Sequence, residues 1–311
     1  SIIMKDPDLR RSIEKIVSPR ILVVGDLMLD HYSWGEVKRV SPEAPIPIMR
    51  VLREDQRLGG AGNVVMNLSA LGAEVIVCGV TGNDETGNTI RKLLSENGVD
   101  NSGVIVADNY KSCLKHRMIA GHTHLLRMDV DPDPDFKFTQ KQLINYLEKS
   151  IPNCDAVIVS DYGKGLLSSA TLKAISACGK KNNIPVVGDP RNTTNYKIYQ
   201  NFTLIKPNRK EAEAAAGFKF KDQKDILRAA KILKTELKVK YLIISLDKDG
   251  LLLFSNPQDY HFVAAETQEV FDVVGAGDIV SSVLTFMLAG KAKIEQAVYW
   301  AQLAASMEIQ H

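Results

Sequence analysis

The second half of the sequence alternates between short apolar segments and longer amphipathic segments, and this alternation restricts the possible folds more than any other feature. The apolar segments have the length and composition of buried strands, and the amphipathic segments have helical periodicity. The expected strands are 156–160, 186–188, 203–206 and 241–246, and the expected helices are 139–149, 168–181, 208–216 and 222–237. A run of such β–α units predicts an α/β fold in three layers, with a mostly parallel central sheet between helices on both faces.

The first half begins with a continuous apolar segment, Ile21 to Gly25, which is typical of a strand buried on both faces of a parallel sheet. Asp26 follows this segment directly, and Asp30 lies shortly after it. Because ligands in open α/β sheets bind beyond the carboxyl ends of the strands, both carboxylates are placed to bind ligand hydroxyls. Turn formation is the alternative explanation for Asp26.

Residues 31–40 and 46–52 have strand character, but no helix separates them, so they do not form a β–α–β unit. We predict a small β-sheet lid built from about 31–52 and part of 112–130. A two-stranded excursion is marginally stable alone, and exposed strand edges favour pairing. We therefore expect a homodimer through the lid; the alternative is a monomer whose lid closes over its own pocket. Residues 1–311, lid included, are expected to form one domain.

A glycine-rich segment precedes an apolar helix near the end of the sequence. Gly275, Ala276 and Gly277 lead into Asp278, and the apolar positions that follow have helical spacing. Free N–H groups at the start of a helix bind anions, and Asp278 in the first turn would lie beside such an anion. An acid in this position suits the removal of a proton from a hydroxyl that attacks a phosphate. The alternative is an acid that only caps the helix.

The composition argues against several classes of protein. A formal net charge of +2 gives no basis for binding nucleic acid or an anionic membrane, and no apolar segment is long enough to span a bilayer. The scattered cysteines indicate reduced thiols in a cytoplasmic protein. His122 and His124 are interpreted as a polar pair rather than a metal site. The sequence contains neither the phosphate-binding motif of P-loop kinases nor the motifs of protein kinases.

Two motifs together resemble the signature of the ribokinase-like (PfkB) sugar kinases. The first is Gly59-Gly60-Ala61-Gly62-Asn63, and the second is Asp272-x-x-Gly275-Ala276-Gly277-Asp278. The resemblance implies a ribokinase-like fold with a lid, ATP as the co-substrate and Mg²⁺. It also implies that Asp278 is the general base, that the backbone of Gly275, Ala276 and Gly277 forms the anion hole, and that Asp26, Asp30, Gly59, Gly60 and Asn63 bind sugar hydroxyls.

Two further segments resemble the nucleotide and metal elements of this family. Asn208 and Glu211 match an Asn-x-x-Glu element, which implies contact with Mg²⁺ through water for the glutamate and with the nucleotide for the asparagine. Alternatively, the pair only caps a helix. Ser245, Asp247 and Gly250 resemble the nucleotide loop, for which a simple hairpin turn is the alternative.

Three other segments resemble one branch of the family, the bacterial D-glycero-D-manno-heptose 7-phosphate kinases of lipopolysaccharide core synthesis. They are residues 25–30, 41–45 and 160–165. The branch implies phosphorylation of the C1 hydroxyl of D-glycero-β-D-manno-heptose 7-phosphate to the 1,7-bisphosphate. The substrate phosphate and hydroxyls would contact residues that lie on expected strands or follow them: Lys115, Arg117, Arg127, Asp189 and Arg191. The alternatives are another sugar kinase, such as a ribokinase or fructokinase relative, and a sugar- or nucleotide-binding protein with reduced catalysis.

The sequence departs from this branch in three places. Val274 and Ile279 stand where the branch usually has threonine, so we expect an effect on metal or phosphate contacts. The sequence given ends at His311, where members usually continue through a glycine-rich turn beside adenine, so we expect an effect on nucleotide affinity. No adenylyltransferase domain of the kind fused to some relatives is expected.

Overall fold

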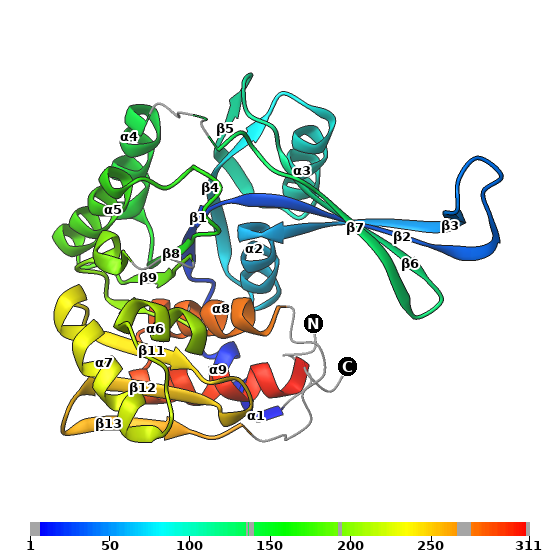
Figure 1. Ribbon diagram of the computed structural model, residues 1–311. Helices are drawn as coiled ribbons and strands as arrows, with labels where there is room; N and C mark the ends of the chain where they lie inside the picture. Colours follow the sequence, from blue (N-terminus) through cyan, green and yellow to red (C-terminus); the bar gives the residue numbers. More distant parts are fainter. Residues whose placement is uncertain (1–6, 135, 137–139, 192–194, 266–274, 309–311) are drawn as a thin grey trace.

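The computed structural model describes residues 7–134, 136, 140–191, 195–265 and 275–308. Its larger sheet has the strand order β13-β12-β11-β10-β9-β8-β1-β4-β5 (Figure 1). The pairs from β5 to β11 are parallel, and only β12 and β13 add antiparallel pairs at one edge. The strands are β1 (Arg20–Gly25), β4 (Glu74–Gly82), β5 (Asp100–Ala107), β8 (Ala156–Ser160), β9 (Val186–Asp189), β10 (Leu204–Ile205), β11 (Tyr241–Ser245), β12 (Leu251–Asn256) and β13 (Asp259–Val263).

Helices cover both faces of this sheet, as Figure 1 shows. Alternate residues of β1 point to opposite faces, so Ile21 and Val23 join one hydrophobic cluster while Leu22 and Val24 join another. The first cluster contains α2, α8 and α9, and the second contains α4, α5 and α7. The helices are α1 (Pro7–Glu14), α2 (Ala61–Ala70), α3 (Glu85–Glu96), α4 (Gln140–Ser150), α5 (Ser169–Asn182), α6 (Arg209–Ala216), α7 (Gln223–Leu237), α8 (Ala276–Ala289) and α9 (Ile294–Glu308). The predicted three-layer α/β fold is confirmed.

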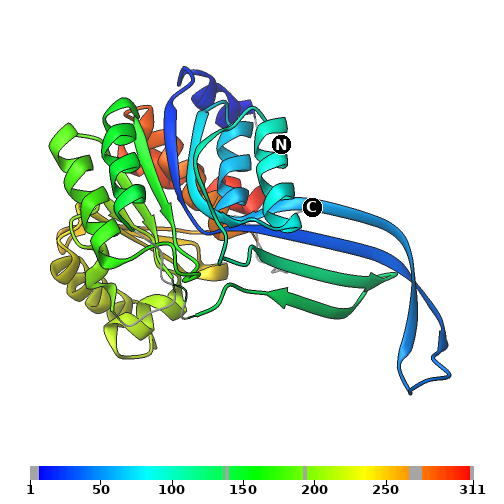
Figure 2. The same cartoon turned by 90° about the horizontal axis from the view of Figure 1, so that it is seen from above.

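The second sheet is the lid, and it projects away from the body of the protein (Figure 2). Its order is β3-β2-β6-β7, built from β2 (Leu27–Val40), β3 (Pro47–Gly60), β6 (Cys113–Ala120) and β7 (Thr123–Val130). Strands β6 and β7 form an antiparallel hairpin within the segment 112–130, part of which was predicted to belong to the lid. The other two strands are longer than the predicted 31–40 and 46–52, because β2 begins almost directly after β1 and stays paired with β3 back to Leu27 and Gly60.

Gly59 and Gly60 therefore end a lid strand, and helix α2 begins only at Ala61. Gly60 has φ 58°, a left-handed conformation that favours glycine, and an added Cβ would approach the backbone oxygen of Asp26. This close approach brings the lid, β1 and α2 together at one point.

None of the described helices has the length and apolar character needed to cross a membrane. Cys78, Cys113, Cys154 and Cys178 are all free thiols, and the first three are buried.

Candidate active site

Charged residues, among them the predicted site residues Asp26 and Asp189, gather where the parallel strands of the larger sheet end. Asp26 follows β1, Asp161 follows β8, Asp189 ends β9, and Lys206 follows β10. The N-terminal half of α8 faces the same edge, since Ser281 of this helix donates a hydrogen bond of 2.7 Å to Asp189. The topology thus brings together side chains that are far apart in the sequence, as parallel strands require.

Asp26 is fully buried, and its two carboxylate oxygens differ in their hydrogen-bond partners. Its Oδ2 atom accepts hydrogen bonds from the backbone N–H groups of Tyr162 (2.8 Å) and Lys164 (3.3 Å). Its Oδ1 atom is buried and has no hydrogen-bond partner in the part of the chain that the structure describes. Burial, with repulsion from Asp161, raises the pKa of Asp26 to about 6. A buried acceptor without a partner is costly, and a sugar hydroxyl would satisfy it.

Asp278 lies in the first turn of α8 with both carboxylate oxygens oriented by neighbours. Asn63 of α2 donates to Oδ2 at 2.8 Å, and the Tyr162 hydroxyl donates to Oδ1 at 2.9 Å. The surrounding protein shields the carboxyl group from water and, with repulsion from Asp189, raises its pKa to about 6. These two hydrogen bonds and the Lys206 charge oppose that rise. A carboxylate with this pKa is ionised at neutral pH and basic enough to take up a proton.

Lys206 places a buried positive charge beside the start of α8. Its side chain is only 4% exposed, and its Nζ atom lies 3.4 Å from Asp189 Oδ1. A Cβ added to Gly277 would lie 3.8 Å from the same Nζ atom, so the ammonium group borders the glycine backbone. Helix N–H groups and a fixed cation together form an environment that stabilises a phosphoryl group.

The lid contributes charged residues from one face of its sheet. Arg117 of β6 donates a hydrogen bond of 2.5 Å to Asp30 of β2, and both side chains are largely buried. Lys115, two residues away on the same face, has its Nζ atom 5.9 Å from the centre of the Tyr162 ring. Gly59 of β3 pairs in register with Met28 of β2, and a Cβ on Gly59 would collide with the Asp30 carboxylate. The lid face that carries Asp30 therefore borders the Asp278 site.

Two of the predicted cationic residues are less enclosed. Arg127 of β7 is paired in register with Arg117, but its side chain is 59% exposed and forms an ion pair with Asp129 at 2.9 Å. Arg191 is one-third exposed, and its Nε atom lies 4.0 Å from Asp161. Both therefore lie at the margin of the site.

The predicted nucleotide elements meet at the carboxyl ends of β10 and β11. Asn208 and Ser245 are joined by an isolated parallel bridge. Gly250 has φ 89°, and a Cβ there would collide with the Val263 backbone. Asp247 is one of the few non-glycine residues with a positive φ, at 52°. The loop 245–250 is therefore fixed in a turn beside the start of α6.

Glu211 and Asn208 form a complete capping box at the start of α6. Asn208 Oδ1 accepts from the Glu211 backbone N–H at 2.9 Å, and Glu211 Oε2 accepts from the Asn208 backbone N–H at 2.8 Å. Burial, with repulsion from Asp189, raises the pKa of Glu211. The pair therefore caps α6, which was the alternative to a role in binding metal or nucleotide. Glu211 also lies near Asp189.

Sequence reasoning missed three residues of the site: Tyr162, Lys206 and Ser281. Tyr162 lies in the segment 160–165, which follows β8 as Asp26 follows β1, so its position after a buried strand was an available signal. Lys206 directly follows β10 in the same way. Ser281 had no such signal, because it lies inside a mostly apolar helix.

Of the two positions at which threonine was expected, Val274 lies outside the described residues, as does Asp272. Ile279 is 5% exposed and packs in the hydrophobic cluster that contains α2 and α9. Its side chain therefore supports the position of α8.

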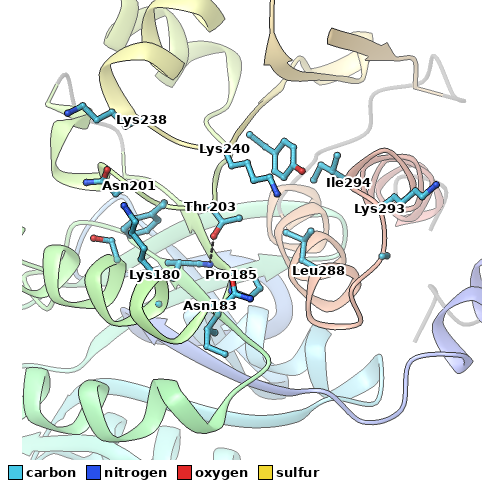
Figure 3. A pocket seen from close by; sticks show the side chains of 17 residues that line it. Lys180, Asn183, Pro185, Asn201, Thr203, Lys238, Lys240, Leu288, Lys293 and Ile294 are labelled. Atoms are coloured by element: carbon cyan, nitrogen blue, oxygen red, sulfur yellow. Dashed lines mark hydrogen bonds between the residues drawn. The ribbon is translucent and has the colours of Figure 1, made fainter.

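A separate pocket of about 540 Å³ lies at the opposite ends of β9, β10 and β11 (Figure 3). Its lining has no carboxylate among the described residues, and its lysines, Lys180, Lys238, Lys240 and Lys293, are all exposed at the surface. It shares no residue with the Asp278 site and offers no base for catalysis.

Comparisons with known proteins agree with this geometry. The model of the family described as "pfkB family carbohydrate kinase" matches residues 18–311. The bifunctional protein HldE of Campylobacter curvus is 43% identical over 289 residues, which cover 93% of this chain and 61% of that protein. The bifunctional protein HldE of Citrifermentans bemidjiense is 40% identical over 307 residues, covering 98% and 63%. The chain thus spans less than two thirds of the length of these relatives.

Solved structures support the fold. Arabidopsis thaliana ribokinase complexed with ribose and ATP matches with a TM-score of 0.73 and 18% identity over 95% of this chain and 94% of that one. Escherichia coli phosphofructokinase-2 in complex with fructose-6-phosphate matches with a TM-score of 0.74 and 20% identity over 94% of each chain. With a ribokinase-like fold and a family match along nearly its whole length, the chain belongs to the pfkB family of carbohydrate kinases.

Proposed function

We propose that the chain transfers the γ-phosphoryl group of ATP to the C1 hydroxyl of D-glycero-β-D-manno-heptose 7-phosphate, giving the 1,7-bisphosphate. The observation that carries the proposal is the arrangement around Asp278: a carboxylate oriented by Asn63 and Tyr162, next to the Lys206 ammonium and the start of α8. The sequence resemblance to heptose 7-phosphate kinases supplies the identity of the sugar. Because ATP is the donor, we place the reaction in the cytoplasm.

The proposed mechanism is an in-line transfer assisted by a general base. Asp26 Oδ1 accepts a hydrogen bond from a sugar hydroxyl and fixes the sugar. The Asp278 carboxylate takes the proton from the C1 hydroxyl as its oxygen forms a bond to the γ-phosphorus, while the bond from the γ-phosphorus to the ADP oxygen breaks. Negative charge on the transferred group is stabilised by the Gly277 region of the α8 backbone and by Lys206.

The remaining contacts of ATP are assigned to the loop 245–250 and to Asn208. Mg²⁺ would be held by the oxygen donors of Asp189 and Glu211, the second of them through water, and would neutralise phosphate charge. Asp189 and Glu211 are suitably placed to hold one Mg²⁺ ion, because their carboxylates lie close enough to repel each other. Both carboxylates are also near Lys206. All of the donor atoms are oxygens, which Mg²⁺ prefers.

The 7-phosphate of the sugar is assigned to the lid. Lys115, Arg117 and Arg127 project from the same face of adjacent lid strands, and this face borders Tyr162. Arginine binds a phosphate through two parallel N–H groups, which favours a phosphorylated substrate.

One observation favours a second candidate, a kinase of an unphosphorylated sugar. Several cations of the site already have carboxylate partners: Arg117 pairs with Asp30, Arg127 with Asp129, and Lys164 with Asp131. A site whose cations are neutralised in this way binds a second phosphate less tightly, because the ion pairs must open.

The experiment measures ADP release with a panel of acceptors: heptose 7-phosphate, heptose, ribose, fructose and fructose 6-phosphate. For the proposed reaction, heptose 7-phosphate has the highest kcat/KM, and ³¹P–¹H coupling in the product locates the new phosphate at C1. Turnover of unphosphorylated sugars alone would reject the heptose 7-phosphate assignment in favour of the second candidate. Sugar binding without phosphoryl transfer in a single turnover would reject both.

We also propose that two copies of the chain associate through their lids. The edges of the lid sheet are β3 and β7, and large apolar side chains on the lid are exposed, among them Val40, Ile46 and Leu52. A second lid would cover these side chains and pair with an edge through a two-fold axis.

A further inference from the structure

Four polar side chains form a compact cluster on the lid, away from the proposed reaction. His31 and Ser33 lie on β2, Glu54 on β3 and His116 on β6. In the register of the sheet, Ser33 is opposite Glu54, and His31 is opposite His116. Successive residues of a strand point to opposite faces, so this cluster occupies the face that does not carry Asp30.

The potential donor atoms of the cluster converge. His31 Nε2 lies 3.2 Å from Glu54 Oε1, and Ser33 Oγ lies 3.0 Å from the same oxygen and 2.7 Å from His116 Nε2. The two imidazole rings are stacked, with centroids 4.1 Å apart and planes 1° from parallel. One donor atom from each histidine and from Glu54 all lie within 4.8 Å of one another.

The chemistry of these donors selects one class of ligand. Two imidazole nitrogens and one carboxylate oxygen are characteristic of sites for zinc and similar transition-metal ions, whereas Mg²⁺ and Ca²⁺ prefer oxygen donors alone. Around a tetrahedral Zn²⁺ with bonds of about 2.1 Å, donor atoms are roughly 3.4 Å apart. To close the cluster around the ion, these side chains would move inward by about 1 Å, and the two stacked rings would tilt so that both nitrogen lone pairs point to the metal.

The cluster is enclosed on one side and open to solvent on the other. The His31 side chain is 17% exposed and Ser33 is buried, whereas Glu54 is 56% exposed and connects the cluster to solvent. An ion can therefore enter from solvent on the Glu54 side and meet two enclosed nitrogens.

We propose that His31, Glu54 and His116 form a lid metal site for one divalent transition-metal ion of the zinc class, with the Ser33 hydroxyl or water completing its coordination. The ion would join β3, β2 and β6. Asp30 directly precedes His31, and Arg117 directly follows His116. The ion would therefore also stiffen the strands that carry Asp30 and Arg117 beside the sugar. The competing account is a hydrogen-bonded cluster that holds no ion.

The test is metal binding by the full chain without a histidine tag, after removal of metals with EDTA. Zn²⁺ is titrated by calorimetry, and Co²⁺ is used as a spectroscopic probe, since imidazole ligation gives intense visible bands in a tetrahedral site. We expect one equivalent of Zn²⁺ and a rise in Tm on its addition. His31→Ala and His116→Ala should each weaken binding by on the order of tenfold or more.

Glu54→Gln is the variant least expected to disturb folding, because Glu54 is exposed, and it should also weaken binding. His124→Ala changes an exposed histidine of the same lid and is the matched control. The Tm of each variant in EDTA reports its folding separately from metal binding. The proposal is overturned if the parent binds no more Zn²⁺ than the His31→Ala/His116→Ala double variant, or if His124→Ala lowers affinity as much as the variants of the site.

Discussion

The Tyr162 hydroxyl donates a hydrogen bond of 2.9 Å to the Asp278 carboxylate, although 116 positions separate the two residues in the sequence. The backbone N–H of the same Tyr162 donates to Asp26 at 2.8 Å. One residue thus orients both the acid proposed to bind the sugar and the acid proposed to remove its proton. The segment after β8 therefore links Asp26, the proposed sugar-binding acid, to Asp278, the proposed base.

Asp278→Asn should abolish turnover and leave sugar affinity nearly unchanged. The amide can keep a hydrogen bond to Tyr162, but it cannot accept the proton of the attacking hydroxyl. A general base contributes about 10²–10⁴-fold to the rate. The kcat and the sugar Kd of parent and variant are compared by ADP release and calorimetry, and a kcat within a few-fold of the parent would remove Asp278 from this role.

Tyr162→Phe should shift the acid limb of the pH–rate profile to higher pH. In the parent, kcat/KM should fall as the pH drops through about 6, because protonated Asp278 cannot act as a base. The Tyr162 hydrogen bond lowers the pKa of Asp278, so its removal raises that pKa and the carboxylate is lost at a higher pH. Asp26 keeps its bond from the backbone of residue 162 in this variant. An acid limb that stays in place would show that another group controls the profile.

Asp26→Asn should make folding stability less dependent on pH. The folded-state pKa of Asp26 is about 6 against an ordinary value of 3.8, so its protonation stabilises the folded state, fully below about pH 4, and this contribution is lost as the pH rises through 6. The unfolding free energy of the variant minus that of the parent should therefore increase by up to about 3 kcal/mol between pH 4 and pH 8. Urea unfolding at several pH values measures it, and a constant difference would contradict the prediction.

Arg117→Ala and Arg127→Ala should weaken binding of heptose 7-phosphate more than binding of heptose. A charge-assisted contact contributes about 1.5–3 kcal/mol, so each loss should reach about tenfold or more. Arg117→Ala should also lower Tm, because it leaves Asp30 without its ion-pair partner. Arg50→Ala, an exposed change on the lid that affects a pair with Glu36, is the control. Equal losses for both sugars would restrict these arginines to structural or hydroxyl contacts.

Trp34→Glu should convert a lid-mediated dimer into a monomer. Trp34 lies on β2 with the Arg53 guanidinium 4.0 Å from its ring, beside the exposed apolar side chains of the lid. A buried negative charge would oppose packing of a second lid. Sedimentation velocity of the parent, of this variant and of Tyr260→Glu, a control on β13 of the body, decides the point. A parent that sediments as a monomer at micromolar concentration, with or without sugar, would end the dimer proposal.

The sequence by itself determined the elements and their order, because hydrophobic periodicity and turn residues act locally. Residues 156–160 were predicted as a strand with its exact bounds, and the helix cap at Asn208 was readable from residue type. Strands at 31–40 and 46–52 were predicted too short, since their additional pairing depends on contacts between β2 and β3 beside the body of the protein.

Only the tertiary structure decided which of these side chains meet. Tyr162 and Lys206 belong to the site because β8 and β10 end at the same edge of the sheet as β1. Their positions after strands could be read locally, but the order of the strands in the sheet could not. The raised pKa values of Asp26 and Asp278 likewise arise from burial by segments distant in sequence. The pairing of His31 with His116 depends on the register between β2 and β6, which long-range packing fixes.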